Sequence, residues 1–172
     1  VIESEGAVGV SVEGVLGVES STIVGADVGL EAGGFEMRGG VVRTTETEGQ
    51  KKEESGKSLT IQGEKIGVTE SWIESEGALV IKGGSAGKID TSVISGNVLS
   101  VEIAGMSEHR GTVYKGKEVE MVGGSMEMIE GVIESEGAVG VSVEGVLGVE
   151  SSTIVGADVG LEAGGFEMRG GV

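Results

Sequence analysis

The beginning of the chain returns unchanged at its end. Residues 1–41 are identical to residues 132–172. Packing alone tolerates many substitutions, so an identity of this length indicates a recent duplication, homogenisation by recombination, or deliberate construction. The chain is thus one unit, residues 1–131, followed by the first third of the next. A repeat of this kind predicts an architecture more readily than an activity.

A finer repeat lies inside the unit. The hexapeptide Ile-Glu-Ser-Glu-Gly-Ala begins at Ile2, Ile73 and Ile133, so the first interval is longer than the second. The same shifts superimpose the apolar residues that surround the hexapeptide. The two parts of the unit therefore share one apolar skeleton and differ in length.

The two parts differ in length at one place. Val42 and Leu59 are separated by sixteen residues, whereas the residues that we take as their counterparts, Val113 and Val119, are separated by five. The extra length belongs to segment 43–58, RTTETEGQKKEESGKS, which has four cationic, four anionic and no apolar side chains. A polar loop inserted into a regular repeat is the simplest interpretation.

Residues 21–40 show the pattern of a single turn of chain. Val28 and Leu30 alternate with small or polar residues, and Phe35 and Met37 alternate again after a glycine pair. Alternation at period two predicts short strands with one buried face, and glycines between strands provide the backbone freedom that corners need. Helices are disfavoured, because each of the 35 glycines would cost about 1 kcal/mol in a helix interior.

Short strands in turns of near-constant length predict an all-β fold, a single-chain β-solenoid or parallel β-helix. One turn cannot bury its own apolar face, so it stacks on its neighbours. We expect about 20 residues per coil and about eight coils in one continuous solenoid over residues 1–172, a rod roughly 40 Å long at about 4.8 Å per stacked strand. Residues 1–131 form the full unit, with coils 1–71 carrying the insertion 43–58, then coils 72–131; residues 132–172 repeat 1–41.

Composition agrees with this fold. The chain has no proline and no cysteine and only four aromatic residues, Phe35, Trp72, Tyr114 and Phe166. The absence of proline fits strands that are paired on both edges, and the scarcity of rings fits a narrow core of stacked aliphatic side chains. No run of 18 apolar residues is present, so we expect no membrane insertion.

The net charge of the chain limits the classes of partner that it is expected to bind. The net charge is −17, and 26 of the 29 acidic residues are glutamate. A solvated acidic face keeps a long rod soluble and apart from its neighbours; a surface for cations or basic partners is the alternative. Nucleic-acid binding is disfavoured, because 12 scattered basic residues give no basic footprint. Calcium-binding solenoids need Asp at fixed positions, and only three Asp occur.

Residues capable of catalysis or metal binding are scarce. His109 is the only histidine, so neither a histidine metal cluster nor a triad with two histidines can be built. We expect His109 in a surface loop. Glu3 and Glu5 lie two apart on one side of a strand, where they solubilise the exterior. We therefore expect no enzyme, no cofactor and no metal site.

The polar segment is the best local candidate for recognition, since loops on rigid scaffolds often carry binding residues. A loop with no binding role is the alternative. Trp72 follows the segment, where the other part of the unit has Val132; it either adjusts the core locally or places its ring on the surface near the loop. The candidate recognition residues are Arg43, Lys51, Lys52, Lys57 and Trp72.

Residues 21–40, STIVGADVGLEAGGFEMRGG, resemble the twenty-residue repeat of filamentous haemagglutinin-like exoproteins. The positions that match its pattern are Ser21, Ile23, Gly25, Val28, Leu30, Ala32, Gly33 and Gly40, with Phe35 and Met37 in place of the usual aliphatic residues. The polar segment and the residues 56–61 that follow it are similar to the Ser/Thr/Lys-rich interruptions of such repeats.

This resemblance implies a right-handed β-helix shaft, secreted by a two-partner route to the extracellular space or the bacterial cell surface. It further implies an adhesin, or the stalk of a contact-dependent toxin, with the surface of a host or neighbouring cell as partner. The alternative is a subunit of a structural filament or sheath whose terminal coils stack end to end on further copies. A spike of three intertwined chains is a third candidate. Identical units favour extension, because they add reach without new sites.

Overall fold

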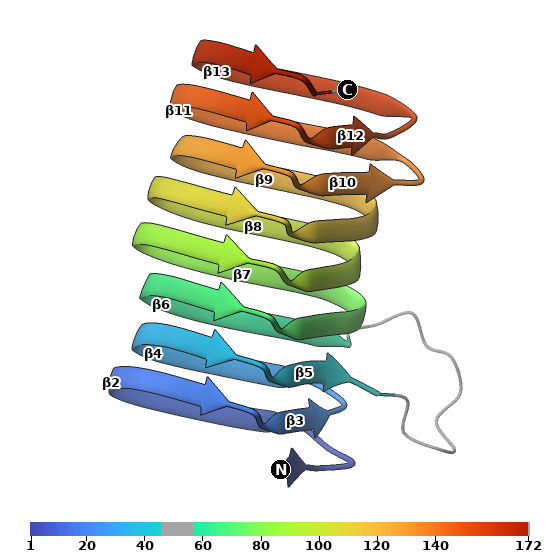
Figure 1. The fold of residues 1–172 in the computed structure, drawn as a ribbon. Coiled ribbons are helices and arrows are strands. Elements are labelled where there is room, and N and C mark those ends of the chain that lie inside the picture. Colours follow the sequence, from blue (N-terminus) through green and yellow to red (C-terminus); the bar gives the residue numbers. More distant parts are fainter. Residues whose placement is uncertain (46–56, 172) are drawn as a thin grey trace.

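The strands pair in parallel with the strands of the neighbouring coils (Figure 1). The computed structural model describes residues 1–45 and 57–171, and none of these lies in a helix. The strands of this described part form one sheet that winds into a stack of coils. They are β1 (Ile2–Glu3), β2 (Val8–Glu19), β3 (Thr22–Gly25), β4 (Val28–Arg38), β5 (Val41–Thr44), β6 (Ser58–Thr69), β7 (Trp72–Asp90), β8 (Val93–Arg110), β9 (Val113–Ile129), β10 (Val132–Ser135), β11 (Ala138–Glu150), β12 (Thr153–Val155) and β13 (Asp158–Arg169).

The pairing register measures the length of a coil. Leu59 pairs with Leu79, and Leu79 with Leu99, at equal intervals along the chain. Val28 pairs with Leu59, an interval that also contains the polar segment. The insertion therefore leaves the stacking of its neighbours unchanged. The predicted β-solenoid, with about 20 residues per coil and about 8 turns, is confirmed.

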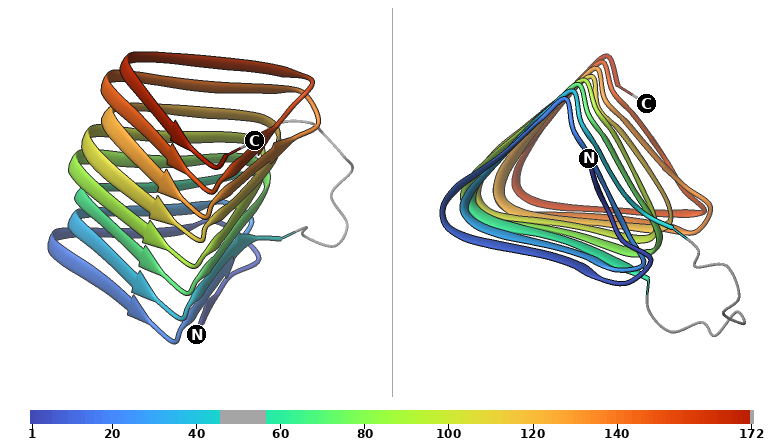
Figure 2. Two further views of the ribbon diagram at one scale, coloured as in Figure 1. Left: turned by 45° about the horizontal axis from the view of Figure 1, so that its top comes forward. Right: turned by 90° about the horizontal axis from the view of Figure 1, so that it is seen from below.

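Each coil is a triangle when viewed along the axis (Figure 2). In the view from below, the coil nearest the reader runs clockwise and the chain recedes, so the solenoid is right-handed. Long strands such as β2 and β4 bend once to make two of the sides, and their register shifts between Val12 and Val15 at this bend. There a Cβ on Gly33 would lie 2.5 Å from the carbonyl oxygen of Glu13, so only glycine fits.

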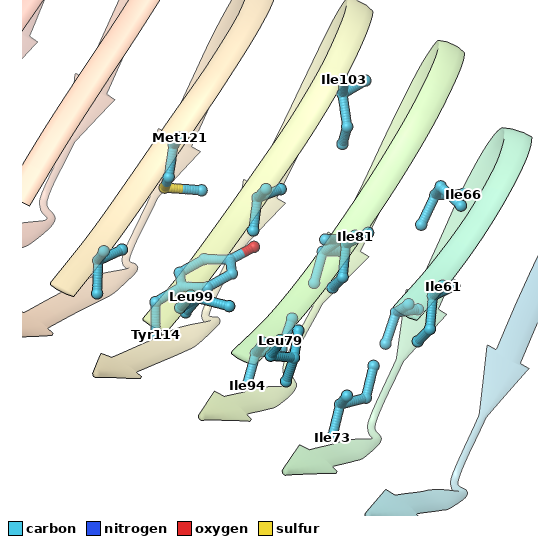
Figure 3. Close-up of a cluster of buried hydrophobic side chains, with 14 of the residues drawn as sticks. Ile61, Ile66, Ile73, Leu79, Ile81, Ile94, Leu99, Ile103, Tyr114 and Met121 are labelled. Carbon is cyan, nitrogen blue, oxygen red and sulfur yellow. The ribbon is translucent and has the colours of Figure 1, made fainter. Parts of the chain in front are cut away.

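The core consists of columns to which each coil contributes one apolar residue. Ile73, Ile94 and Tyr114 pair in register and occupy the same place in successive coils (Figure 3). All three are fully buried. Because burial of a side chain of this size stabilises the fold by about 1.5–3 kcal/mol, every coil contributes to the stability of the two coils beside it.

The columns correct one detail of the repeat alignment. Val42 points into the core in the column of Ile73 and Tyr114, whereas Val113 lies in the outer column with Trp72. The expected equivalence of Val42 and Val113 is therefore wrong by one residue. Successive residues of a strand face opposite sides, so an error of one position exchanges the core for the surface.

One corner of each coil contains a residue with left-handed backbone. In the described residues these have φ between 45° and 60°: Ser20, Gly39, Glu70, Thr91, Gly111, Glu130, Ser151 and Gly170. A small residue follows each of them. Ser92, for example, accepts a hydrogen bond from Ser71 N (3.2 Å) and donates one to Asp90 O (2.8 Å). The non-glycine residues at this corner are strained, at about 1–2 kcal/mol each.

Replacement of Glu130 by glycine should stabilise the protein. Glycine adopts the φ of 54° found there without steric cost, so Glu130→Gly should raise the free energy of unfolding by about 1 kcal/mol. The matched control is Glu127→Gly on the exposed side of β9, which should lower it by about 0.5–1 kcal/mol. Urea denaturation at pH 7 measures both, and a destabilised Glu130→Gly would contradict the strain.

Candidate recognition surface

The candidate recognition residues come from two neighbouring coils. Arg43 lies exposed on β5, in register with Glu74 of β7. Trp72 opens β7, two residues before Glu74. Because β5 and β7 pair in register here, these side chains lie on the same side of the triangle, close to the corner that follows Thr44. Lys51 and Lys52 lie outside the described residues.

Lys57 lies at the same corner, where the chain returns to the solenoid. Its Nζ forms an ion pair with Glu76 of the following coil. The next residue, Ser58, donates hydrogen bonds from its N and Oγ to Asp27 Oδ1, at 2.8 and 3.3 Å. The returning chain is thus held by the coils on both sides, and Lys57 has a structural role besides its place in the candidate surface.

The repeated Ile-Glu-Ser-Glu-Gly motif forms this corner in other coils. Ser135 is buried, donates to Ala138 O (3.1 Å) and accepts from Gly137 N (3.2 Å). Ser75 makes the same two contacts in an earlier coil, at 3.0 and 3.3 Å. The hydrogen bonds of a tight corner therefore explain the recurrence of the motif, and no chemistry of its glutamates is needed.

Trp72 is half-exposed, at 50% of its surface. It stands between Val41 and Val93 in an outer column that continues to Val132. Of the two interpretations of this residue, the surface ring is confirmed and the core adjustment is wrong, because the core position of the coil belongs to Ile73. The result is an apolar stripe with one aromatic ring on the outer surface.

Opposite charges on neighbouring coils form ion pairs at several places on the outer surface. Lys82 Nζ lies 3.0 Å from Glu102 Oε2, and Lys115 Nζ lies 2.9 Å from Glu134 Oε2. Exposed pairs like these contribute about 0–1 kcal/mol each. Within the described ranges, no group of three or more His, Asp or Glu side chains is placed to hold a metal ion. The part of the chain that the structure describes also contains no helix long and apolar enough to cross a membrane.

A polar pair lies inside the core. His109 and Tyr114 are fully buried, and His109 Nδ1 lies 2.5 Å from Tyr114 Oη. The rings meet edge to face, with centroids 5.6 Å apart and planes at 69°. One hydrogen bond joins the Tyr114 hydroxyl and His109 Nδ1. His109 Nε2 has no hydrogen-bond partner among the described residues. The pair is enclosed, so no substrate reaches it.

The prediction that His109 lies in a surface loop is wrong. Its neighbours in the column are Ile89 and Met128, both buried. The alternation of the strand indicates the core position, because it places His109 on the side opposite Arg110 and Glu108. Applying the period-two rule through this segment would have placed the imidazole in the core.

Burial determines the protonation of the pair. It lowers the pKa of His109 from 6.5 to about 4, because the core disfavours the charged imidazolium. Burial likewise raises the pKa of Tyr114. Both side chains are therefore neutral at pH 7. The folded state binds the proton of His109 more weakly than the unfolded state does, so acidification from pH 6.5 to pH 4 reduces stability.

This pair predicts an acid-sensitive component of stability. Between pH 7 and pH 5 the unfolding free energy should fall by about 2 kcal/mol from His109 alone. The double variant His109→Met/Tyr114→Ile restores the residue types of the two columns and should lack this component. Urea denaturation of both proteins at several pH values isolates the difference, since the two proteins differ only at these two positions. Equal pH dependence of the two proteins would contradict the buried neutral histidine.

Trp72 supplies its own reporter, because it is the only tryptophan of the chain. Since Trp72 is 50% exposed, acrylamide should quench its emission readily in the folded protein. The control variant Trp72→Val/Val93→Trp moves the ring one coil along the same column and should be quenched similarly. A blue-shifted, weakly quenched emission from Trp72 would show that the ring is covered.

Comparisons with known proteins do not indicate what this surface binds. The chain matches no family model, no curated protein and no solved structure. The resemblance of residues 21–40 to the filamentous haemagglutinin-like repeat therefore stays a prediction. What the molecule does must follow from the geometry of its coils.

Proposed function

We propose that the chain is a structural shaft, a stiff spacer whose length is set by the number of its coils. The continuity of the core carries this proposal. Buried apolar residues follow one another from Val8 to Val149, and Val28 pairs with Leu59, so the columns continue on both sides of the insertion. Bending such a stack would break ladder hydrogen bonds and core contacts together, so the rod resists bending.

The duplicated residues support extension as the selected property. Val8 pairs with Val28, and their copies Val139 and Val159 pair in the same way. Even the register shift at the bend recurs, between Val12 and Val15 and between their copies. Adding a unit therefore adds length with the geometry unchanged, about 29 Å for six coils.

An extracellular or cell-surface location forms part of the proposal, with the shaft belonging to an adhesin or a delivery stalk. The motif of residues 21–40 supports it, as does the net charge of −17, which keeps neighbouring rods apart. The surface around Arg43, Lys57 and Trp72 is the place where such a shaft would contact a host or neighbouring cell. A second complete unit would present it again about 29 Å further along.

Small-angle scattering tests the shaft. The 172-residue chain is compared with a variant that carries one more copy of residues 42–172, at concentrations where light scattering gives monomer mass. The longest dimension should increase by about 29 Å, with the radius of gyration of the cross-section unchanged. A thicker particle, or a bent one with two rods at variable angles, would contradict a stiff shaft.

A further inference from the structure

One side of the triangle carries two rows of outward side chains that run along the axis. The first is the apolar stripe, whose members are Val41, Trp72, Val93, Val113 and Val132. The second lies two residues further along each strand and consists of Arg43, Glu74, Ser95, Lys115 and Glu134. Residues two apart on a strand point to the same side, so both rows form one face, the two-row face. Its strands β5, β7, β8, β9 and β10 are each paired on both edges.

The second row has a charge order that is complementary to itself. From Arg43 the row runs positive, negative, neutral, positive and negative, and it ends at Glu134. Read from Glu134, the same row runs negative, positive, neutral, negative and positive. Turned end for end and laid on itself, the row therefore meets an opposite charge at every charged position. Ser95, which is neutral, lies at its centre.

We propose that the two-row face binds the two-row face of a second copy of the chain. The two rods lie antiparallel, related by a twofold axis that passes through Val93 and Ser95 along the start of β8. An axis along the strand sets apolar row against apolar row and charged row against charged row. The shaft requires one chain only, so this inference goes beyond it, and either can fail without the other.

In this arrangement the charged residues pair between the copies. Arg43 faces Glu134 of the second copy, and Glu74 faces Lys115. Each contact occurs twice because of the twofold axis. Within one chain Lys115 Nζ lies 2.9 Å from Glu134 Oε2, whereas neither Arg43 nor Glu74 forms an ion pair among the described residues. The second copy supplies a partner for both.

The apolar row also fits its own copy. Val41 faces Val132, Trp72 faces Val113, and Val93 faces itself on the axis. Trp72 is the most exposed of these side chains, at 50%, and the contact would cover its ring. Sheets that pack face to face lie about 10 Å apart, which places both rows in contact. A large aromatic ring near the centre of an interface typically carries much of the binding energy.

The charges select one register. Displacing the second copy by one coil sets Arg43 against Lys115 in one direction and Glu74 against Glu134 in the other. Displacing it by two coils sets Glu74 or Lys115 against its own copy. A parallel arrangement, with the twofold axis along the rods, sets the charged row against the apolar row. Like charges in contact cost several kcal/mol, so the antiparallel register centred on Ser95 is favoured over these alternatives.

The size of the face determines the strength of the dimer. The rows are two residues wide and about 24 Å long, at about 4.8 Å per coil. This area is below the roughly 800 Å² per partner of a stable complex, so the dimer is weak and forms at raised concentration. The net charge of −17 opposes it at low salt, and about 0.15 M salt screens this repulsion. Both faces are used up in the pair, so assembly stops at the dimer.

Sedimentation of the wild-type chain at increasing concentration tests the dimer. The mass should rise from monomer to dimer and no further, and the emission of Trp72 should shift to shorter wavelength in step with it. A chain that stays monomeric at millimolar concentration overturns the dimer and leaves the shaft intact. Larger assemblies overturn it too. Emission that is already blue-shifted in dilute solution overturns it as well, because another part of the same chain then covers the ring.

Charge reversal tests the register. Glu74→Lys sets two cations opposite each other, and Lys115→Glu sets two anions opposite each other. Each variant should raise the dissociation constant of its homodimer at least tenfold. A mixture of the two should form a mixed dimer, because both contacts then join opposite charges. The double variant Glu74→Lys/Lys115→Glu should dimerise within about threefold of the wild type, which a general loss of folding would not allow.

The matched control is Glu102→Lys, which makes the same change of net charge on another side of the triangle. Glu102 is exposed and pairs with Lys82 of the neighbouring coil, so the control also removes one surface ion pair. Its dimer should be at least as strong as that of the wild type. An equal loss of dimer in Glu102→Lys and Glu74→Lys would overturn the two-row face, as would a mixture of Glu74→Lys and Lys115→Glu that stays monomeric.

Cross-linking locates the twofold axis. The chain has no cysteine, so Ser95→Cys introduces one thiol on the axis, where its own copy lies about 10 Å away across the interface. A short bis-maleimide should join two chains through it. Ser100→Cys is the matched control, because Ser100 lies in the same coil on another side of the triangle and is likewise half-buried. Its yield should be at least tenfold lower, and equal yields would overturn the dimer, because random collision produces them.

Discussion

The whole molecule depends on the contact between one coil and the next. A single coil has an inward row of apolar side chains and no means of covering them, and the backbone groups of its strands have no strand partners within the coil. Stacking satisfies both at once, since parallel pairing joins the backbone while columns such as Ile73, Ile94 and Tyr114 fill the interior. The triangle, the corners and the outer charges are arranged around this contact.

The corners explain how an irregular sequence is compatible with a regular core. Strand residues are constrained on both sides by neighbouring coils, but a corner needs only to reverse direction and satisfy a few backbone groups. Serine side chains do this at Ser75, Ser92 and Ser135. Lys57 and Ser58 follow the insertion at a corner, where Glu76 and Asp27 hold them. The insertion therefore lies at a corner, where the strand ladder constrains the sequence least.

Much of the fold could be predicted, because the repeat makes the period-two pattern visible many times. The coil length, the position of the insertion and the apolar columns all follow from it. Errors arose where one residue of register decides between inside and outside, as with Val42 and Val113. The position of His109 is mispredicted for a different reason. Its polar side chain suggests a surface position, whereas the alternation of its strand places it in the core. Its hydrogen bond to Tyr114 crosses a corner, where simple alternation does not apply.

The candidate surface was less predictable than the core. Sequence alone brought Arg43 and Trp72 near each other, but not the apolar stripe that Trp72 shares with Val41 and Val93. That stripe depends on which residues of separate coils fall into one outer column. Coil-to-coil register can be inferred from a repeat only when the insertion is placed to the residue.

Phe35 and Phe166 show how the burial of a core residue depends on the position of its coil in the stack. They belong to identical segments and differ in burial only because one has a further coil above it. In a one-dimensional stack, each coil is held by its immediate neighbours, so opening begins at the ends and advances inward. Partial unfolding therefore shortens the rod, while the coils that remain folded keep their triangular shape. A molecule that has lost its outermost coil still presents an apolar coil at that end, now formed by the preceding turn.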